Sequence, residues 1–153
     1  MSIVSNSGDK NATIARLLQN PGDMANAIKI YYGADAASKF NTLMTAHLTI
    51  AAELVQDSLN GDAVKAADAE KRWQANADDI ATALSSLNPS NWSKDALESM
   101  LYEHLSVTKQ EAVDLITKNY TASVTDYDKI HDQALMMADA LSGGIIKQFP
   151  NKF

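Results

Sequence analysis

Residues 16–28 read RLLQNPGDMANAI, and residues 72–84 read RWQANADDIATAL. The two segments share Arg, Asn, Asp and a set of small and aliphatic residues at matching positions. A weaker third copy, KIHDQALMMADAL, lies at residues 129–141. A second element, FNTLMTAHLTI at residues 40–50, returns as LESMLYEHLSV at residues 97–107. Both elements repeat after about 57 residues, the length of a hairpin of two long helices. The sequence therefore predicts an all-α protein built from a repeated helical hairpin.

Apolar residues recur at alternating spacings of three and four, which is typical of helices that bury one face. The pattern predicts helices over residues 12–31, 34–59, 63–87 and 94–119, and a fifth that starts at Thr121 or Ser123. Pro21-Gly22 predicts a kink or a break, a capping-box pattern from Thr108 predicts a break near Val107, and Gly143-Gly144 predicts a frayed end. The core stripe predicted for the last helix is Val124, Tyr127, Ile130, Ala134, Met137, Leu141 and Ile145.

Long helices joined by short loops run antiparallel to their neighbours. We therefore expect an up-down four-helix bundle with a shorter, kinked N-terminal helix packed on one side. A solenoid of hairpins is the alternative, but solenoid repeats are usually shorter and more numerous. Residues 1–10 are predicted to be a disordered tail, and residues 11–153 a single helical domain.

Composition excludes several classes of function. The 153-residue chain has a net charge of -6 and no cysteine, so disulfides, thiolate metal sites and cysteine nucleophiles are excluded. It has no basic stripe for phosphate contacts, so nucleic acid is not expected as a partner. No apolar run reaches the roughly 18 residues of a membrane span, and the polar N-terminus lacks a signal-peptide core. These features predict a cytoplasmic protein.

Two histidines lie on predicted core stripes, His47 on the second helix and His104 on the fourth. Counting residues from the predicted turns places both at a similar depth, in a layer with Asn76, Trp73, Met136 and Asp139. Such a layer could bind Zn or Cu, because imidazole, carboxylate and thioether groups suit borderline and soft metals. The simpler interpretation is that both imidazoles are core residues bonded to neighbouring polar groups, with no cofactor. His131 is predicted to be half-exposed or to face a partner.

Catalytic motifs are absent from the sequence. The Glu-x-x-His motif of di-iron bundles is missing, because Met44, Leu101 and Asp128 stand three residues before the histidines. No phosphate loop, nucleophile elbow or zincin motif occurs, and no pair of carboxylates stands out as an acid and a base. The sequence therefore favours a binding or structural protein over an enzyme.

Several short segments of the chain are distinctive: RLLQN at residues 16–20, NAI at 26–28, YYG at 31–33, AHL at 46–48, Trp73 with ANAD at 75–78, NP at 88–89 with NW at 91–92, and GIIKQFP at 144–150. Together they resemble an uncharacterised family of small bacterial helical proteins. The resemblance implies a helical bundle and a bacterial origin, and it carries no established activity. It also implies a further long helix before the first one, which is absent here. A helix without its partner leaves an apolar stripe uncovered, so we expect a homodimer with an interface that includes Leu17, Met24, Ile28 and Tyr31.

Overall fold

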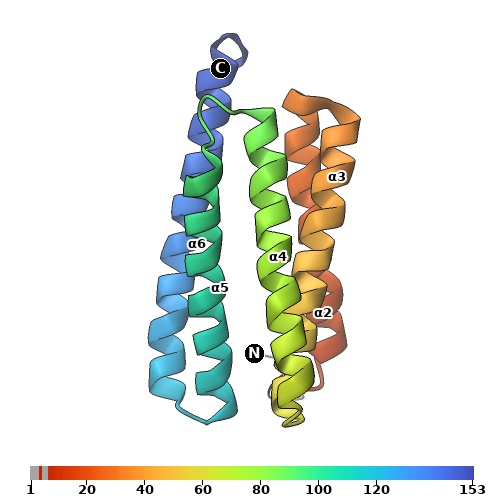
Figure 1. Ribbon diagram of the computed structural model, residues 1–153, viewed down its shortest axis with the longest axis vertical. Helices are drawn as coiled ribbons and strands as arrows, with labels where there is room; N and C mark the ends of the chain where they lie inside the picture. Colours follow the sequence, from red (N-terminus) through yellow and green to blue (C-terminus); the bar gives the residue numbers. More distant parts are fainter. Residues whose placement is uncertain (1–3, 5–6) are drawn as a thin grey trace. The chain divides into compact units, whose positions relative to one another are not determined.

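The computed structural model describes residue 4 and residues 7–153, and this part of the chain is helical, without a strand. Its helices are α2 (Lys10–Leu17), α3 (Asn20–Leu59), α4 (Ala63–Leu87), α5 (Lys94–Ile116) and α6 (Tyr120–Gln148), followed by the 3₁₀ turn η1 (Pro150–Lys152) (Figure 1). The predicted all-α class is confirmed. The predicted tail lies partly outside the described residues, and α2 already includes its last residue.

The chain divides into two compact units, Met1–Ile80 and Ala81–Phe153. The first contains α2, α3 and most of α4, and the second contains the end of α4 with α5 and α6. The single domain expected over residues 11–153 stays a prediction. Among the described residues, no helix combines the length and the apolar character that a membrane crossing requires.

Two breaks shape the N-terminal part of the first unit. The Pro21 ring lacks an N–H and, in a continuous helix, would clash with the Leu17 carbonyl. Accordingly α2 ends at Leu17 and α3 begins at Asn20, so of the predicted kink or break the chain has a break. Inside α3, Gly33 has φ 86° and ψ 177°, which is a conformation almost confined to glycine. The chain turns sharply there (Figure 1), and the second half of α3 matches the helix predicted over residues 34–59.

The second half of α3 and α4 form an antiparallel hairpin within the first unit. The side chain of Asn76 bonds to the Leu43 carbonyl, and Arg72 Nη2 lies 2.8 Å from Glu53 Oε2. The residue numbers of the contacting residues therefore decrease along α4 as they increase along α3, which is the order of antiparallel helices. Apolar side chains fill this unit, and its best buried members include Phe40, Leu54, Ala69, Trp73, Ala77 and Ile80.

In the second unit, α5 and α6 lie side by side (Figure 1). A side-chain cap forms at the start of α5, where Ser93 Oγ accepts the Ala96 N–H at 3.3 Å. The predicted break near Val107 is wrong, because α5 continues unbroken to Ile116. Lys118 then adopts φ 62°, which reverses the chain before α6 begins at Tyr120.

The predicted fraying at Gly143-Gly144 is also wrong, because α6 continues to Gln148. Tertiary contacts hold this end in place. Asn88 Nδ2 donates to the Gly144 carbonyl at 2.9 Å, and Gln148 Nε2 donates to the Leu87 carbonyl at 3.0 Å. Gly144 also lies directly against the Trp92 indole, where a side chain would not fit.

Candidate functional site

His47 is buried on α3 and is bonded to an amide of α4. Its Nδ1 lies 2.8 Å from Asn76 Oδ1, and Asn76 Nδ2 donates to the Leu43 carbonyl at 3.1 Å. One amide therefore bridges the imidazole and the backbone one helical turn before it. The structure thus brings together two of the predicted site residues, His47 and Asn76.

His104 is half-buried on α5 and has the same arrangement. Its Nδ1 lies 3.1 Å from Gln133 Oε1, and Gln133 Nε2 donates to the Met100 carbonyl at 3.0 Å. Sequence reasoning missed Gln133 as the partner, although Gln133 stands at the position that corresponds to Asn76 in the third copy of the repeat. Each imidazole–amide pair is 29 residues apart, and each amide–carbonyl pair is 33 residues apart.

These bonds fix the tautomer of both rings. A carbonyl oxygen only accepts, so the amide NH₂ must face the backbone and the amide oxygen must face the imidazole. Nδ1 of His47 and of His104 is therefore the protonated nitrogen in the neutral ring, and Nε2 carries the lone pair. Burial lowers the pKa of His104, while the hydrogen bond with Gln133 acts in the opposite direction. The neutral form is thereby favoured near pH 7.

Trp73 packs against His47 in the first unit. The ring centroids are 5.3 Å apart and the planes are inclined by 40°. Trp73 Nε1 is buried without a hydrogen-bond partner in the described part of the chain. A buried indole N–H usually has a hydrogen-bond partner, so Trp73 Nε1 is an unsatisfied donor next to His47.

The structure places other predicted site residues away from the core. Met136 is 66% exposed, and Asp139 and His131 are exposed on α6 as well. The prediction that Met136 and Asp139 lie in a buried layer is therefore wrong: Gln133, one turn earlier on α6, takes the inward position. His131 Nδ1 lies 3.2 Å from Asp132 Oδ1 at the surface. In the described residues, no group of three or more His, Asp or Glu side chains is arranged to hold a metal ion.

A cluster of carboxylates near the α5–α6 turn was not predicted. Glu111, Asp114 and Asp126 are all buried there. Ser123 Oγ donates to Glu111 Oε1 at 3.3 Å, and Lys129 Nζ lies 2.7 Å from Asp126 Oδ1. Burial raises the pKa of Glu111, whereas the bond from Lys129 lowers the pKa of Asp126. Hydrophobic periodicity gives no signal for such a cluster, because it scores carboxylates as surface residues.

The predicted interface residues differ in how far they are covered. Leu17 is 41% exposed and Met24 is 38% exposed, whereas Ile28 is buried and Tyr31 is half-buried. Ile28 is thus already covered, contrary to the prediction that its face is open. Helix α2 has no buried residue.

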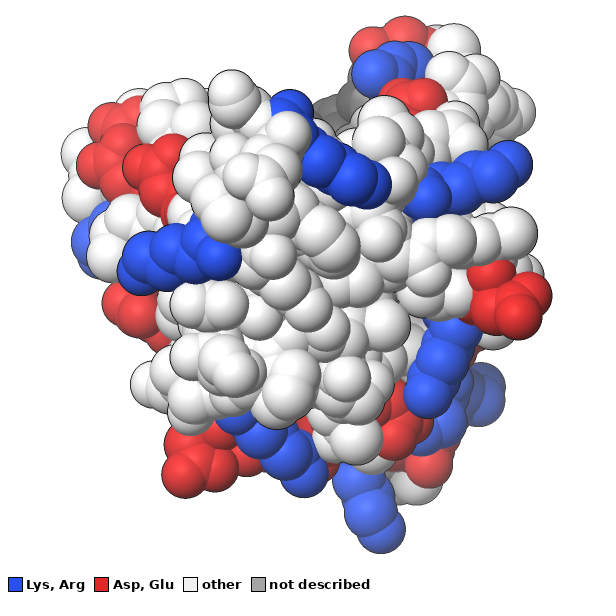
Figure 2. All heavy atoms as spheres, turned by 90° about the horizontal axis from the view of Figure 1, so that it is seen from above, with Lys and Arg blue, Asp and Glu red and all other residues white. Residues whose placement is uncertain are grey.

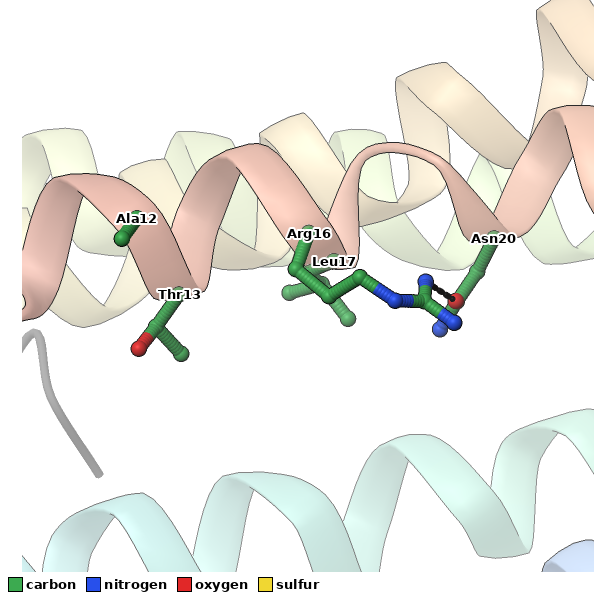
Figure 3. Close-up of a pocket in the computed structure, with 5 residues that line it drawn as sticks. All are labelled: Ala12, Thr13, Arg16, Leu17 and Asn20. Atoms are coloured by element: carbon green, nitrogen blue, oxygen red, sulfur yellow. Dashed lines mark hydrogen bonds between the residues drawn. The ribbon is translucent and has the colours of Figure 1, made fainter.

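A shallow, open depression of about 630 Å³ lies along α2 and the start of α3 (Figure 3). It is lined by Ala12, Thr13, Arg16, Leu17 and Asn20. Arg16 Nη1 donates to Asn20 Oδ1 at 2.7 Å across the break between the two helices, which holds the basic side chain along this face. The depression therefore combines an exposed leucine with a positioned cation.

In the view of Figure 2, Lys and Arg side chains are interspersed with Asp and Glu side chains.

No family model matches the chain, and the curated proteins and solved structures contain no significant match either. The resemblance to a bacterial helical family stays a prediction, and function must be argued from the side chains described above.

Proposed function

We propose that this chain is a non-enzymatic helical protein that self-associates through an exposed apolar surface at its N-terminal end. This surface, called the N-terminal face below, consists of Leu17, Leu18 and Met24. The observation that carries the proposal is that α2 buries none of its residues, although two leucines follow one another at its end.

The energetics favour covering this face. Full burial of a Leu or Met side chain contributes about 1.5–3 kcal/mol, so covering residues about four-tenths exposed contributes on the order of 1 kcal/mol each. An eight-residue helix is also too short to be stable alone in water. A partner that buries the N-terminal face would therefore stabilise α2 itself.

Light scattering coupled to size-exclusion chromatography tests the proposal. The wild-type chain is expected to be a dimer at micromolar concentration, and Leu17→Asp with Met24→Asp is expected to shift it to a monomer. Val64→Asp is the matched control, because Val64 is 81% exposed on α4 and lies outside the face. A wild-type monomer across the micromolar range, or equal loss of dimer in both variants, contradicts the proposal.

The second candidate function is binding of a metal or small ligand by His47 and His104. The observation that favours it is the tautomer, since a ring that donates through Nδ1 to an oxygen presents the Nε2 lone pair, as metal-binding histidines do. Against it stands the finding that, among the described residues, neither ring belongs to a group of three or more His, Asp or Glu side chains that could hold a metal ion.

Metal analysis of the purified protein, followed by titration with Zn, Cu, Ni and Co, tests this candidate. Binding by these residues predicts that His47→Ala and His104→Ala each weaken the affinity at least tenfold. His131→Ala is the control, because His131 is an exposed histidine bonded only to its neighbour in the known contacts. Equal affinity in all three variants would exclude the two histidines as ligands.

We also infer that the chain arose by duplication of a helical hairpin and forms an up-down bundle. The support is the pair of amide bridges: His104 follows His47 by the same number of residues as Gln133 follows Asn76. Two copies of one ancestral unit are expected to form the same hydrogen bonds at corresponding positions. The short connections between the helices favour the up-down order.

A further inference from the structure

Helix α6 exposes part of its predicted core stripe, while Ile130, Met137, Leu141 and Ile145 of that stripe are half-buried. Val124 is 63% exposed and Tyr127 is 53% exposed, although both belong to the predicted core stripe. The residues of α6 that are buried are Ser123, Asp126, Gln133 and Gly144. The predicted orientation of this helix is therefore wrong at these positions, and the reason lies in its polar contacts with α5.

Three contacts hold the polar face of α6 inward. Gln133 bridges His104 and the Met100 carbonyl, and Ser123 donates to Glu111. The 3.6-residue period then turns the opposite residues outward. They form a row along one side of the helix, called the α6 stripe below, and its members are Tyr120, Val124, Tyr127 and Leu135.

One edge of the α6 stripe is acidic. Asp128, Asp132 and Asp139 are all exposed, and their spacings of four and seven residues place them on one line along the helix. A partner for the α6 stripe must therefore bring apolar side chains and positive charge together.

The N-terminal face has this combination. Its leucines and methionine are exposed, and the segment from Lys10 to Tyr32 carries three basic side chains, Lys10, Arg16 and Lys29, against one acidic side chain, Asp23. Arg16 lies in the same depression as Leu17, so cation and apolar surface are presented side by side (Figure 3). Its ion pair with Asp23 is 3.8 Å long and joins side chains that are 64% and 66% exposed, so it is weak enough to be exchanged.

We propose that the N-terminal face of one copy docks on the α6 stripe of a second copy; this inference rests on the proposed self-association and names its second surface. Pairing α6 with α6 would bring two acidic edges together, and pairing two N-terminal faces would bring basic residues together. The mixed pairing joins the acidic edge to the more basic N-terminal segment. Each copy supplies one surface of each kind, so a two-fold dimer in which both contacts form would cover both surfaces of each copy.

Cysteine crosslinking tests this pairing cleanly, because the natural chain has no cysteine. Leu17→Cys and Leu135→Cys chains are prepared separately with tags of different mass, mixed and mildly oxidised. The yield of the mixed Leu17→Cys–Leu135→Cys disulfide is expected to be at least five times the yield of either disulfide between identical chains. Val64→Cys mixed with each of them is the control for random collision. A mixed yield no higher than that control overturns the inference.

Charge provides the second measurement. Replacing Asp128, Asp132 and Asp139 together by Asn should weaken dimerisation at least tenfold at low salt, with a smaller effect at high salt. Asp35→Asn, at an exposed site on α3, should leave dimerisation unchanged. A wild-type monomer refutes both the proposed function and this inference. A stable dimer that neither the charge variant nor crosslinking affects refutes the pairing alone.

Discussion

The contact between Gly144 and Trp92 gives the sharpest stability prediction. A methyl group built on Gly144 would lie 2.7 Å from Trp92 Cδ1 and 2.9 Å from Cε2, with Nε1 nearer still. Carbon atoms in favourable contact are about 3.5–4.0 Å apart, so the Gly144→Ala side chain overlaps a rigid ring. Trp92 is 3% exposed and has little room to move aside.

The neighbouring glycine isolates the cost of this overlap. A methyl group on Gly143 meets no atom within 4 Å, yet Gly143 lies on the same helix. Replacing a helical Gly by Ala contributes about 1 kcal/mol of stability in either case. Overpacking costs about 1–3 kcal/mol, so Gly144→Ala should be less stable than Gly143→Ala by about that amount. For 2 kcal/mol, the melting temperatures of the two variants should differ by about 4–8 °C.

Urea unfolding followed by circular dichroism and by tryptophan fluorescence measures the difference. A Trp73→Phe background for all variants leaves Trp92 as the only tryptophan, so that tryptophan emission reports the second unit. The mutated chains should keep the same slope against urea, which shows that only stability has changed. Equal midpoints for Gly144→Ala and Gly143→Ala would refute the reasoning, because the indole would then have moved without cost.

Four further predictions use the same unfolding measurements. Gly33→Ala should lower the free energy of unfolding by about 1–3 kcal/mol, because a residue with a side chain is strained at a φ of 86°. Gly22→Ala is the control and should not be destabilised, since a methyl group there also meets no atom within 4 Å. Equal urea midpoints for the two variants would contradict this. Asn76→Ala should cost about 1–3 kcal/mol by removing the partner of a buried imidazole, and a loss under about 0.5 kcal/mol would show that the bridge contributes little. Because the pKa of His104 is lowered in the folded chain, wild-type stability should fall as pH drops below about 6.5, where the unfolded chain takes up a proton first, and His104→Gln should reduce that slope. Because burial raises the pKa of Glu111 in the folded chain, wild-type stability should fall as pH rises from the ordinary glutamate pKa to this raised pKa. Glu111→Gln should therefore gain stability relative to wild type over that range and keep the gain at higher pH; no gain by pH 7.5 would contradict this.

Local physics explains which parts of the fold could be predicted. Helix α4 was predicted with both ends correct, because its three-four pattern lies between an Asn-Gly turn and an Asn-Pro loop. The breaks at Pro21 and Gly33 likewise follow from residues whose backbone limits are intrinsic. The capping-box pattern at Thr108 misled the prediction, because the same residues fit inside a continuous helix when their neighbours favour one.

The sequence by itself determined the all-α class, the turns and the inward position of His47, since propensity and periodicity act within one helix. Only the tertiary structure decided which face of α6 turns inward, because that choice depends on polar partners contributed by α5. A period of 3.6 residues locates an apolar stripe, but it carries no information on whether hydrogen bonds from Gln133 and Ser123 hold the opposite face against a neighbour. The order at Gly144 was likewise invisible in the sequence, because an indole more than fifty positions away in the chain holds it.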